Sequence, residues 1–258
     1  MLILTKTKRM KKSIIFLIVT FVFQLHCLIA QTSNGSSDIN KTDTKGKKQG
    51  EWKKADKEGR LIYSGSFLDD KPLGHFIYYD STGAVKAESD FSENGTHSFT
   101  VTYFKTGGKM SEGLYVNEKR EGVWKFYNED KLLISEEVYR NGVAEGVWKT
   151  YYANGALLEE ITYRNGVKEG PWKQYFFDGP VKLSATYKNG KLEGLATFFH
   201  PNGRVMISGP YVNNFKDGIW MYISDKGVAE KREVWSNGFL SAEEYYDKAR
   251  EKLVKEEK

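Results

Sequence analysis

The sequence predicts an all-β protein: an elongated, single-layer antiparallel β-meander of eight 24-residue hairpin repeats with a short C-terminal α-helix cap. Three observations predict it. A 24-residue unit recurs eight times without insertion, an aromatic residue stands seventeen positions after every start, and a glycine stands nine positions after every start except in unit four, where Lys131 replaces it. A period kept this strictly indicates a repeat architecture. The units start at Gly50, Gly74, Ser98, Gly122, Gly146, Gly170, Gly194 and Gly218.

Each unit is predicted to form one β-hairpin, most clearly in residues 146–169. Asn154-Gly155 is typical of a two-residue type I′ turn, because asparagine and glycine tolerate the positive φ that both turn positions need. This turn sets Lys149 opposite Glu160, where opposite charges attract across the ladder.

A second turn, about four residues long, is expected to begin at Asn165-Gly166 and lead to the next unit, so that the hairpins continue as one meander. Within the first strand of a unit, side chains alternate between the two faces of the sheet. Trp148 therefore points to one face, and Val147 and Lys149 point to the other. Both faces carry aromatic residues, as expected of a single layer stabilised by stacking neighbouring repeats.

The repeated pattern G-x-W-x-x-Y-Y-x-N-G, followed by E-x-x-Y-x-N-G, resembles the MORN-repeat variant of bacterial proteins over about three-quarters of the chain. Unit three departs from it at Ser98 and Thr100, and unit seven at Ala196, so these units are expected to be weak or bent points. The resemblance implies an extended repeat sheet used as a scaffold or binding surface. Many bacterial members also carry the label of a toxin–antitoxin system antitoxin. The pattern is matched by Gly146, Trp148, Tyr151, Tyr152, Asn154, Gly155, Glu160, Tyr163, Asn165 and Gly166.

Residues 1–30 are predicted to be a signal peptide, with Met10 as an alternative start. Basic residues precede an apolar run from Ser13 to Val22 that is too short for a membrane span, and the small Ala30 precedes a polar stretch. We therefore expect export, with cleavage after Ala30, to a periplasmic, outer-membrane-associated or extracellular location in a bacterium.

The only cysteine, Cys27, offers an alternative N-terminus. As the lipidated first residue of a lipoprotein it would anchor the protein to a membrane, although His26 stands where such sequences hold a small residue. If cleavage follows Ala30 instead, the mature chain has no thiol and no cysteine metal site.

Two short segments are expected to flank the repeat sheet, which should span residues 46–240. Residues 31–45 are polar, small and without periodicity, which predicts a flexible linker. Residues 241–258 predict an α-helix, because Ser241 and Glu244 have the spacing of a capping box and apolar residues follow at helical intervals. This helix is expected to cover the last strand, since exposed sheet edges invite aggregation.

The charge distribution argues against nucleic acid as a partner. The net charge is +5, but residues 1–30 contain five basic residues and no acidic one. Without that segment, 34 basic residues face 34 acidic ones, whereas a nucleic-acid-binding domain keeps a basic excess on its folded part.

No catalytic, phosphate-binding or metal-binding motif is found in the sequence. Glu88, Glu112, Glu136 and Glu160 stand fourteen positions after successive starts and form a row. Neighbours in this row are expected about 10 Å apart, which is too far to share one ion. A cross-strand lysine such as Lys149 is their expected partner. We therefore predict a protein that is not an enzyme and uses no cofactor or metal.

The candidate binding residues are tryptophans and lysines at fixed repeat positions. The preferred interpretation of the tryptophans is a structural ladder of stacked rings; the alternative is an aromatic platform for a sugar, a peptide or a lipid headgroup. The candidates are Trp124, Trp148, Trp172, Trp220, Lys125, Lys149 and Lys173.

Together these features predict an exported, non-enzymatic scaffold for protein–protein interaction, whose partner the sequence does not identify. One alternative is a glycan-binding or cell-wall-binding module that uses Trp124, Trp148 and Trp172 as a stacking strip. The other is an antitoxin-like component of a toxin–antitoxin system. The signal peptide argues against it, because an antitoxin must meet its toxin in the cytosol.

Overall fold

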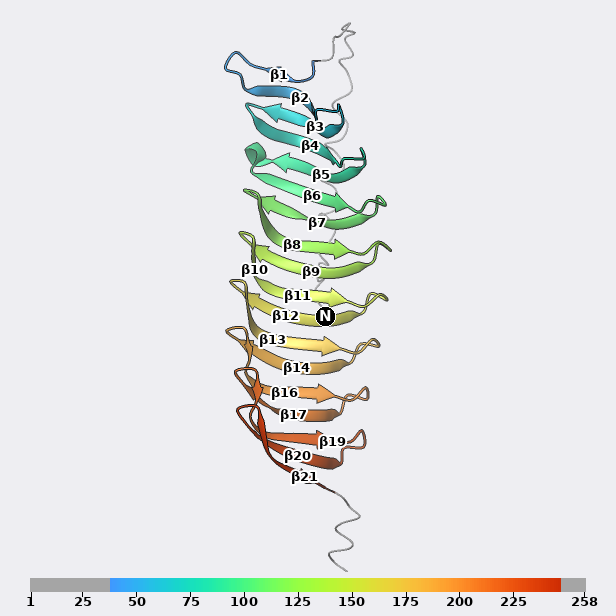
Figure 1. Ribbon diagram of the computed structural model, residues 1–258, viewed down its shortest axis with the longest axis vertical. Helices are drawn as coiled ribbons and strands as arrows, with labels where there is room; N and C mark the ends of the chain where they lie inside the picture. Colours follow the sequence, from blue (N-terminus) through green and yellow to red (C-terminus); the bar gives the residue numbers. More distant parts are fainter. Residues whose placement is uncertain (1–37, 247–258) are drawn as a thin grey trace, which may run out of the picture. The chain divides into compact units, whose positions relative to one another are not determined.

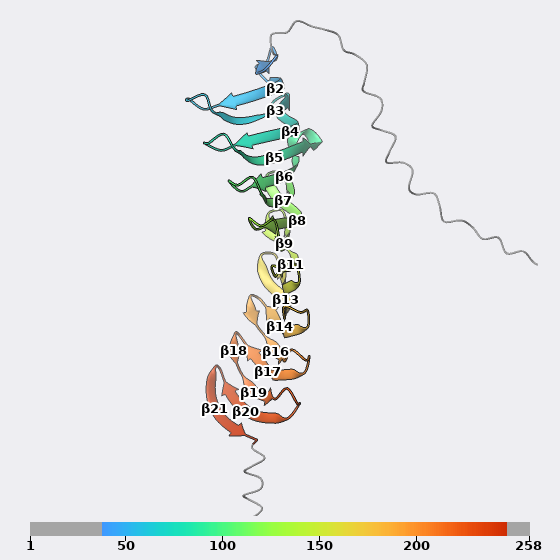
Figure 2. The same cartoon turned by 90° about the vertical axis from the view of Figure 1, so that its right-hand side faces the viewer.

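The computed structural model describes residues 38–246, which form one antiparallel sheet of 21 strands and one 3₁₀ turn (Figure 1). Strands pair in chain order, each hairpin beside the next, so the predicted all-β meander of 24-residue repeats is confirmed. Seen from the side, successive hairpins rotate about the long axis of the sheet (Figure 2), as the twist of β-strands requires. No helix in the described part of the chain is long and apolar enough to cross a membrane.

Most strands have six to nine residues, and β1, β10, β15 and β18 have two. The strands are β1 (Lys41–Thr42), β2 (Lys48–Ala55), β3 (Leu61–Leu68), β4 (Lys71–Tyr79), β5 (Val85–Ser92), β6 (His97–Tyr103), β7 (Lys109–Val116), β8 (Lys119–Tyr127), β9 (Leu133–Arg140), β10 (Val143–Ala144), β11 (Gly146–Tyr151), β12 (Leu157–Arg164), β13 (Val167–Tyr175), β14 (Val181–Lys188), β15 (Lys191–Leu192), β16 (Gly194–Phe199), β17 (Val205–Val212), β18 (Phe215–Lys216), β19 (Gly218–Ile223), β20 (Ala229–Ser236) and β21 (Phe239–Tyr245), with the 3₁₀ turn η1 at Glu93–Gly95.

The hairpin of β11 and β12 follows the predicted register away from its turn. Lys149 pairs with Glu160, as expected. A β-bulge after Thr150 then shifts the ladder by one residue, so that Tyr151 pairs with Leu157. The bulge arises because the turn between these strands is not the type I′ turn that the sequence predicts.

The two kinds of turn exchange their predicted roles. At the first, Gly155 has a φ of 84° but Asn154 does not enter the positive-φ region, and the Gly155 N–H donates to the carbonyl of Tyr152 (2.9 Å). This is a longer loop that ends in a left-handed glycine and produces the bulge. At the second, Asn165 and Gly166 have φ values of 49° and 80° and form the two-residue turn.

The glycine that starts a unit bends the chain between repeats. The backbone at this position is left-handed, a conformation that is about 1–2 kcal/mol less favourable for a residue with a Cβ, so the position favours glycine. All seven starting glycines have positive φ, from 65° to 103°. Before Gly146, β10 pairs with the end of β9, and β11 then pairs with the middle of β9. Ser98, which starts unit three, is not in the left-handed region, and the β5–β6 ladder has no register shift.

The buried side chains lie on one face of the sheet, which we call the aromatic face. Among the described residues, every buried position stands zero, two, thirteen or fifteen residues after the start of its unit. These positions alternate along their strands and pair across the ladder, as Trp148 does with Ile161. The largest buried side chains are Trp124 and Trp220. The single layer therefore has a one-sided core.

The C-terminal end of the sheet differs from the prediction. Residues 239–245 form β21, which pairs with β20 and is the outermost strand among the described residues, so the helix expected from Ser241 is wrong in this part. The Ser241 hydroxyl does not cap a helix but donates to the carbonyl of Val234 (2.8 Å), and Glu244 pairs with Arg232 (2.7 Å). Cross-strand partners on β20 outweigh the local capping pattern. Residues 247–258 of the predicted helix lie outside the described residues.

The N-terminal end of the described residues also contains a strand. Lys41 and Thr42 form β1 and pair with β2, although residues 31–45 are predicted to be a flexible linker. The side chain of Asn40 accepts from the N–H of Lys53 (2.8 Å) and donates to its carbonyl (3.0 Å), which covers the edge of β2 further along. The predicted signal peptide, Cys27 and the first part of the linker lie outside the described residues.

Candidate binding surfaces of the sheet

A regular repeat holds its tryptophan between two tyrosine rings on the aromatic face. In unit five, the ring centroid of Trp148 lies 5.3 Å from that of Tyr139 and 4.6 Å from that of Tyr163. The indole N–H of Trp148 donates a 2.9 Å hydrogen bond to the carbonyl of Val138, ten residues earlier. The ring therefore joins two neighbouring repeats.

Two of the candidate tryptophans are too buried to bind a ligand. Trp124 and Trp220 are 1% and 0% exposed, and their indole N–H groups donate to backbone carbonyls (3.0 Å each). A sugar needs an exposed indole face, so the alternative stacking strip of Trp124, Trp148 and Trp172 is wrong at its first member. Trp148 and Trp172 are half-buried, and the N–H of Trp172 is taken by Glu159 (2.7 Å).

Basic side chains lie over these rings from two positions before the start of a unit. The guanidinium of Arg120 lies 4.7 Å from the ring centroid of Trp124 and 5.2 Å from that of Tyr139. Such contacts contribute about 0.5–1 kcal/mol when exposed and more when desolvated. The sequence-based candidates omit this position, although a basic residue recurs there. The equivalent cations are Lys48, Lys168 and Lys216.

Each glutamate of the row accepts a hydrogen bond from a tyrosine of the following repeat. Tyr151 donates to Glu136 (2.8 Å) and Tyr175 donates to Glu160 (2.7 Å). The expected lysine partners are farther away, since Lys149 lies 3.8 Å from Glu160. Burial and then the hydrogen bond to Glu136 raise the pKa of Tyr151 to about 12. The same pairs, with the same direction of pKa change, are Tyr103–Glu88 (2.8 Å) and Tyr127–Glu112 (2.6 Å).

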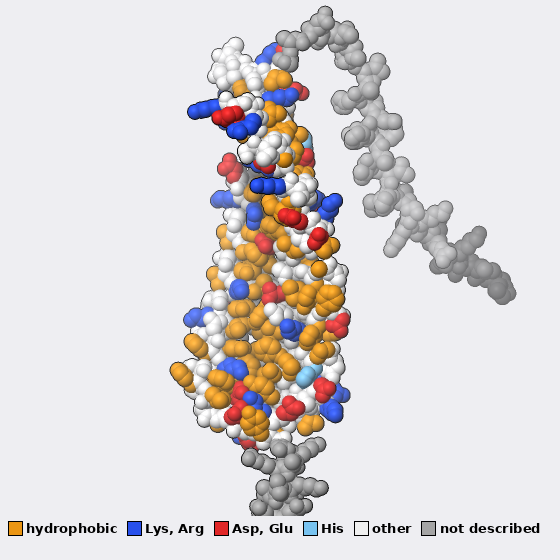
Figure 3. Space-filling model, turned by 45° about the vertical axis from the view of Figure 1, so that its right-hand side comes forward, with side chains coloured by type: hydrophobic (Ala, Val, Ile, Leu, Met, Phe, Trp, Pro, Cys, Tyr) orange, Lys and Arg blue, Asp and Glu red, His pale blue; other side chains and the backbone are white. Residues whose placement is uncertain are grey.

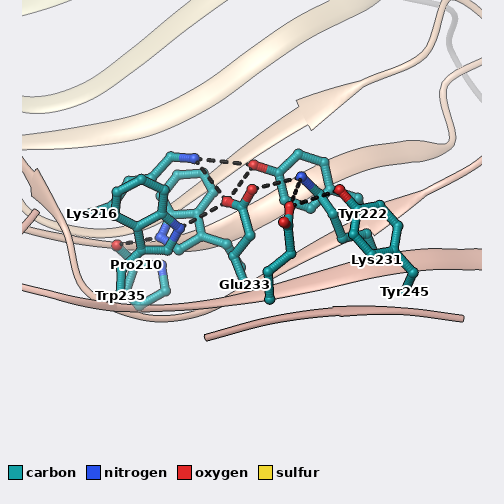
Figure 4. Close-up of polar contacts among 9 residues, drawn as sticks. Pro210, Lys216, Tyr222, Lys231, Glu233, Trp235 and Tyr245 are labelled. Atoms are coloured by element: carbon teal, nitrogen blue, oxygen red, sulfur yellow. Dashed lines mark hydrogen bonds and ion pairs between the residues drawn. The ribbon is translucent and has the colours of Figure 1, made fainter. Parts of the chain in front are cut away.

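One carboxylate is buried at the C-terminal end of the sheet (Figure 4). Glu233 is 6% exposed and accepts hydrogen bonds from Lys231 (2.7 Å), Tyr222 (2.7 Å) and Trp235 (2.8 Å). Burial opposes its ionisation, but these donors outweigh burial and lower the pKa of Glu233 to about 2. Lys231 also reaches Glu243 on β21 (2.8 Å), so the cluster fastens the last strand to the sheet.

The opposite face carries exposed apolar side chains one position after the start of five units, whereas Glu51 and His75 stand at this position in units one and two. We define the apolar strip as this row together with the apolar residues that stand sixteen positions after the starts of the units. Figure 3, in which tyrosine and tryptophan share the colour of the other hydrophobic residues, shows hydrophobic side chains at the surface of the middle and lower repeats. The exposed members are Phe99 (46%), Val123 (52%), Val147 (42%), Leu195 (64%) and Ile219 (51%).

The candidate lysines share the face of the apolar strip, away from the tryptophans. Adjacent residues in a strand point to opposite faces, so Lys149 lies on the other side of the sheet from Trp148. Lys125 lies 3.9 Å from Glu136, and Lys173 is exposed. The tryptophans and lysines therefore do not form one site.

These features define a β-hairpin repeat protein with a one-sided aromatic core. The MORN repeat variant family matches three consecutive stretches, residues 144–165, 168–189 and 192–213. The resemblance seen in the sequence is confirmed in these three stretches, which are MORN-variant repeats. Repeats of this kind are generally protein-binding or membrane-binding modules.

No curated protein matches the sequence. Among solved structures, TarM of S. aureus is 17% identical over 36% of this chain and 20% of its own, with a TM-score of 0.28. The TcdB2–TccC3–Cdc42 structure is 12% identical over 72% of this chain and 13% of its own, with a TM-score of 0.19. A porin-like protein from Bacteroides uniformis is 8% identical over 74% of this chain and 91% of its own, also with a TM-score of 0.19. With TM-scores this low, these similarities support no conclusion.

Proposed function

We propose that this protein is a non-enzymatic scaffold that binds a partner protein through the apolar strip. The observation that carries the proposal is the exposure of apolar side chains at one repeat position, between 42% and 64% in five units. Exposed apolar residues that are scattered singly need no explanation, whereas a contiguous row indicates an interaction surface.

The apolar strip is contiguous from unit three to unit five, where the apolar Leu114 and Val138 of the second repeat position fill the gaps. Val123 pairs across the ladder with Val138. The next strand, β11, pairs with β9 at Lys149 and Glu136, and its Gly146, which precedes Val147, lies against the side chain of Val138. Two strand spacings, about 10 Å, separate Val123 from Val147, and one side chain occupies the space between them.

Charged groups border the apolar strip and suit a protein partner. Lys125 and Lys149 lie on the same face, two positions further along their strands, beside Glu136 and Glu160. An apolar centre with a polar rim is the arrangement of protein–protein interfaces, where the centre contributes most of the affinity.

Charge reversal on the apolar strip tests the proposal. Because Val123 and Leu195 are exposed, V123E and L195E should leave the thermal unfolding of the sheet nearly unchanged. We expect the double variant to lose the proteins that the wild-type chain captures from a bacterial envelope extract. The matched control is F177E, which changes an equally exposed apolar residue (58%) in a hairpin loop. Capture that survives V123E/L195E, or that F177E also abolishes, would contradict the proposal.

Export is the second part of the proposal and rests on the predicted signal peptide. Mass spectrometry of the N-terminus of the protein from its native host tests it directly. A chain that begins at Gln31 supports secretion or a periplasmic location, and one that begins at a lipidated Cys27 supports a membrane-anchored scaffold. An uncleaved chain in the cytosol would contradict export and favour the antitoxin alternative.

A further inference from the structure

Unit three contains a pocket where the regular repeats hold a tryptophan. The pocket has a volume of about 570 Å³. Thr100 stands at the tryptophan position, and Ser98 stands in place of the starting glycine; both residues line the pocket. A volume of roughly 300–1,000 Å³ is typical of small-molecule sites.

Two aromatic rings wall this pocket. Around a regular tryptophan such as Trp148, the flanking rings stand seventeen positions after the preceding start and after the start of the same unit. Around Thr100, the residues at these two positions are Phe91 and Tyr115, and both line the pocket. The outer side of Tyr115 packs on Trp124, with ring centroids 4.7 Å apart. No indole therefore lies between Phe91 and Tyr115, whereas one lies between the equivalent rings of a regular repeat.

The missing glycine keeps the pocket open. In regular units the left-handed glycine and the bulge beside it bring the preceding residues over the aromatic face, as they do for Arg120. The backbone of Ser98 is not left-handed, and the pairing of β6 with β5 keeps one register from Ala87 to Ser92. The turn at η1 therefore leaves Thr96 at the margin of the pocket, where it is one of the lining residues.

Unit seven shows that losing the tryptophan alone does not open a pocket. Ala196 replaces the tryptophan there, but Gly194 keeps its positive φ of 79°. Leu192, two positions before the start, packs against the cluster that contains Ala196, which is 1% exposed. Unit three differs because both the indole and the bulge are absent.

The floor of the pocket is made of hydroxyl groups. Ser89, Ser98 and Thr100 are buried at 4%, 7% and 7% exposure, and the hydroxyl oxygens of Ser89 and Thr100 lie 2.8 Å apart. Each hydroxyl has one donor and two acceptor sites, so this pair retains a donor and several acceptors for a ligand. The single charged residue that lines the pocket is Glu118, which disfavours an anionic ligand.

We propose that the pocket of unit three binds one neutral pyranose ring of a carbohydrate between Phe91 and Tyr115. The C–H faces of such a ring pack on aromatic walls, and its hydroxyls pair with a hydroxyl floor. An apolar side chain of a partner protein fits less well, because it cannot use the donor and acceptor sites that Ser89 and Thr100 retain. The site lies on the aromatic face, away from the apolar strip, and is independent of the scaffold function.

Titration of the full mature chain with maltotriose, cellotriose and chitotriose tests the proposal. Saturation-transfer NMR detects binding, and a change in the total tryptophan fluorescence is expected on occupancy because the ring of Trp124 packs on Tyr115. At least one trisaccharide should bind. T100W, which restores the regular repeat residue, should abolish binding. Loss of one hydroxyl in S89A should weaken binding by about tenfold, the effect of losing roughly one hydrogen bond.

Two further variants separate binding from folding. F91L keeps an apolar side chain but removes the aromatic wall, and should weaken binding while the circular dichroism and melting temperature stay near wild type. T186V removes an exposed hydroxyl on the opposite face and should bind like the wild type. The proposal is overturned if none of the three sugars binds at millimolar concentration, or if binding survives T100W. It is equally overturned if a tryptophan-containing peptide, but no sugar, occupies the pocket.

Discussion

The phenol of Tyr151 donates a 2.8 Å hydrogen bond to the carboxylate of Glu136, which belongs to the preceding repeat. The bond connects side chains of β9 and β11 on the face opposite the tryptophans. Three other pairs repeat it at the same positions, so one type of contact joins units two to six. In a repeat protein, contacts between neighbours supply much of the stability.

Removing one of these hydroxyls should loosen one boundary between repeats. We expect Y151F to lower the free energy of unfolding by about 1 kcal/mol, because a hydrogen bond to a charged group is lost from a half-buried site. Urea denaturation followed by circular dichroism measures the change. The control is Y79F, because Ser64 stands where the carboxylate partner of Tyr79 would be. Equal losses in the two variants would show that the glutamate row contributes nothing.

The same tyrosines predict alkaline unfolding. Burial, followed by the hydrogen bond to a glutamate, raises the pKa of Tyr151 to about 12 from the ordinary 10.0. The unfolded chain therefore loses its phenolic protons first, so this contribution to stability is complete below pH 10.0 and disappears as the pH rises towards about 12. Melting temperatures measured across this range should fall steeply. The fall should be shallower in a variant with phenylalanine at Tyr103, Tyr127, Tyr151 and Tyr175, and an unchanged slope would refute the assignment.

The sequence predicts the meander correctly, and its register away from the turn, because both follow from the strict period. The pairing of Lys149 with Glu160 depends only on counting from the turn and survives the bulge beside it. The type of each turn is harder to predict, since Asn-Gly occurs in both. What separates Asn165-Gly166 from Asn154-Gly155 is the φ of the asparagine, which the surrounding ladder decides.

The candidate sites were harder to predict than the fold. Alternation along a strand already separates Lys149 from Trp148, but it does not say which face is buried. The complete burial of Trp220 depends on rings and cations from neighbouring units, including Lys216. At the C-terminus, Ser241 and Glu244 have the spacing of a helix cap, yet pairing with β20 prevails because a strand gains partners that an isolated helix lacks.

Glycines that face a ring should tolerate alanine less well than glycines that serve the backbone. A Cβ on Gly113 would lie 2.4 Å from the ring of Trp124, so G113A should displace the indole and cost about 1–3 kcal/mol or more. The control, G122A, meets no atom within 4 Å and incurs only the left-handed strain of about 1–2 kcal/mol. Tryptophan emission separates the two, since a red shift is expected in G113A alone. A red shift of the same size in G122A would contradict this packing.

The last strand should depend on one ammonium group. Lys231 bridges Glu233 and Glu243 at 2.7 and 2.8 Å, and so joins β20 to β21 (Figure 4). K231M removes both ion pairs and leaves the buried Glu233 with fewer donors, so the amides of β21 should exchange with deuterium much faster while those of the central repeats do not. The control is R232M, which breaks the more exposed pair with Glu244 and should change little, because such pairs contribute about 0–1 kcal/mol. Equal acceleration in K231M and R232M would mean that backbone pairing alone holds β21.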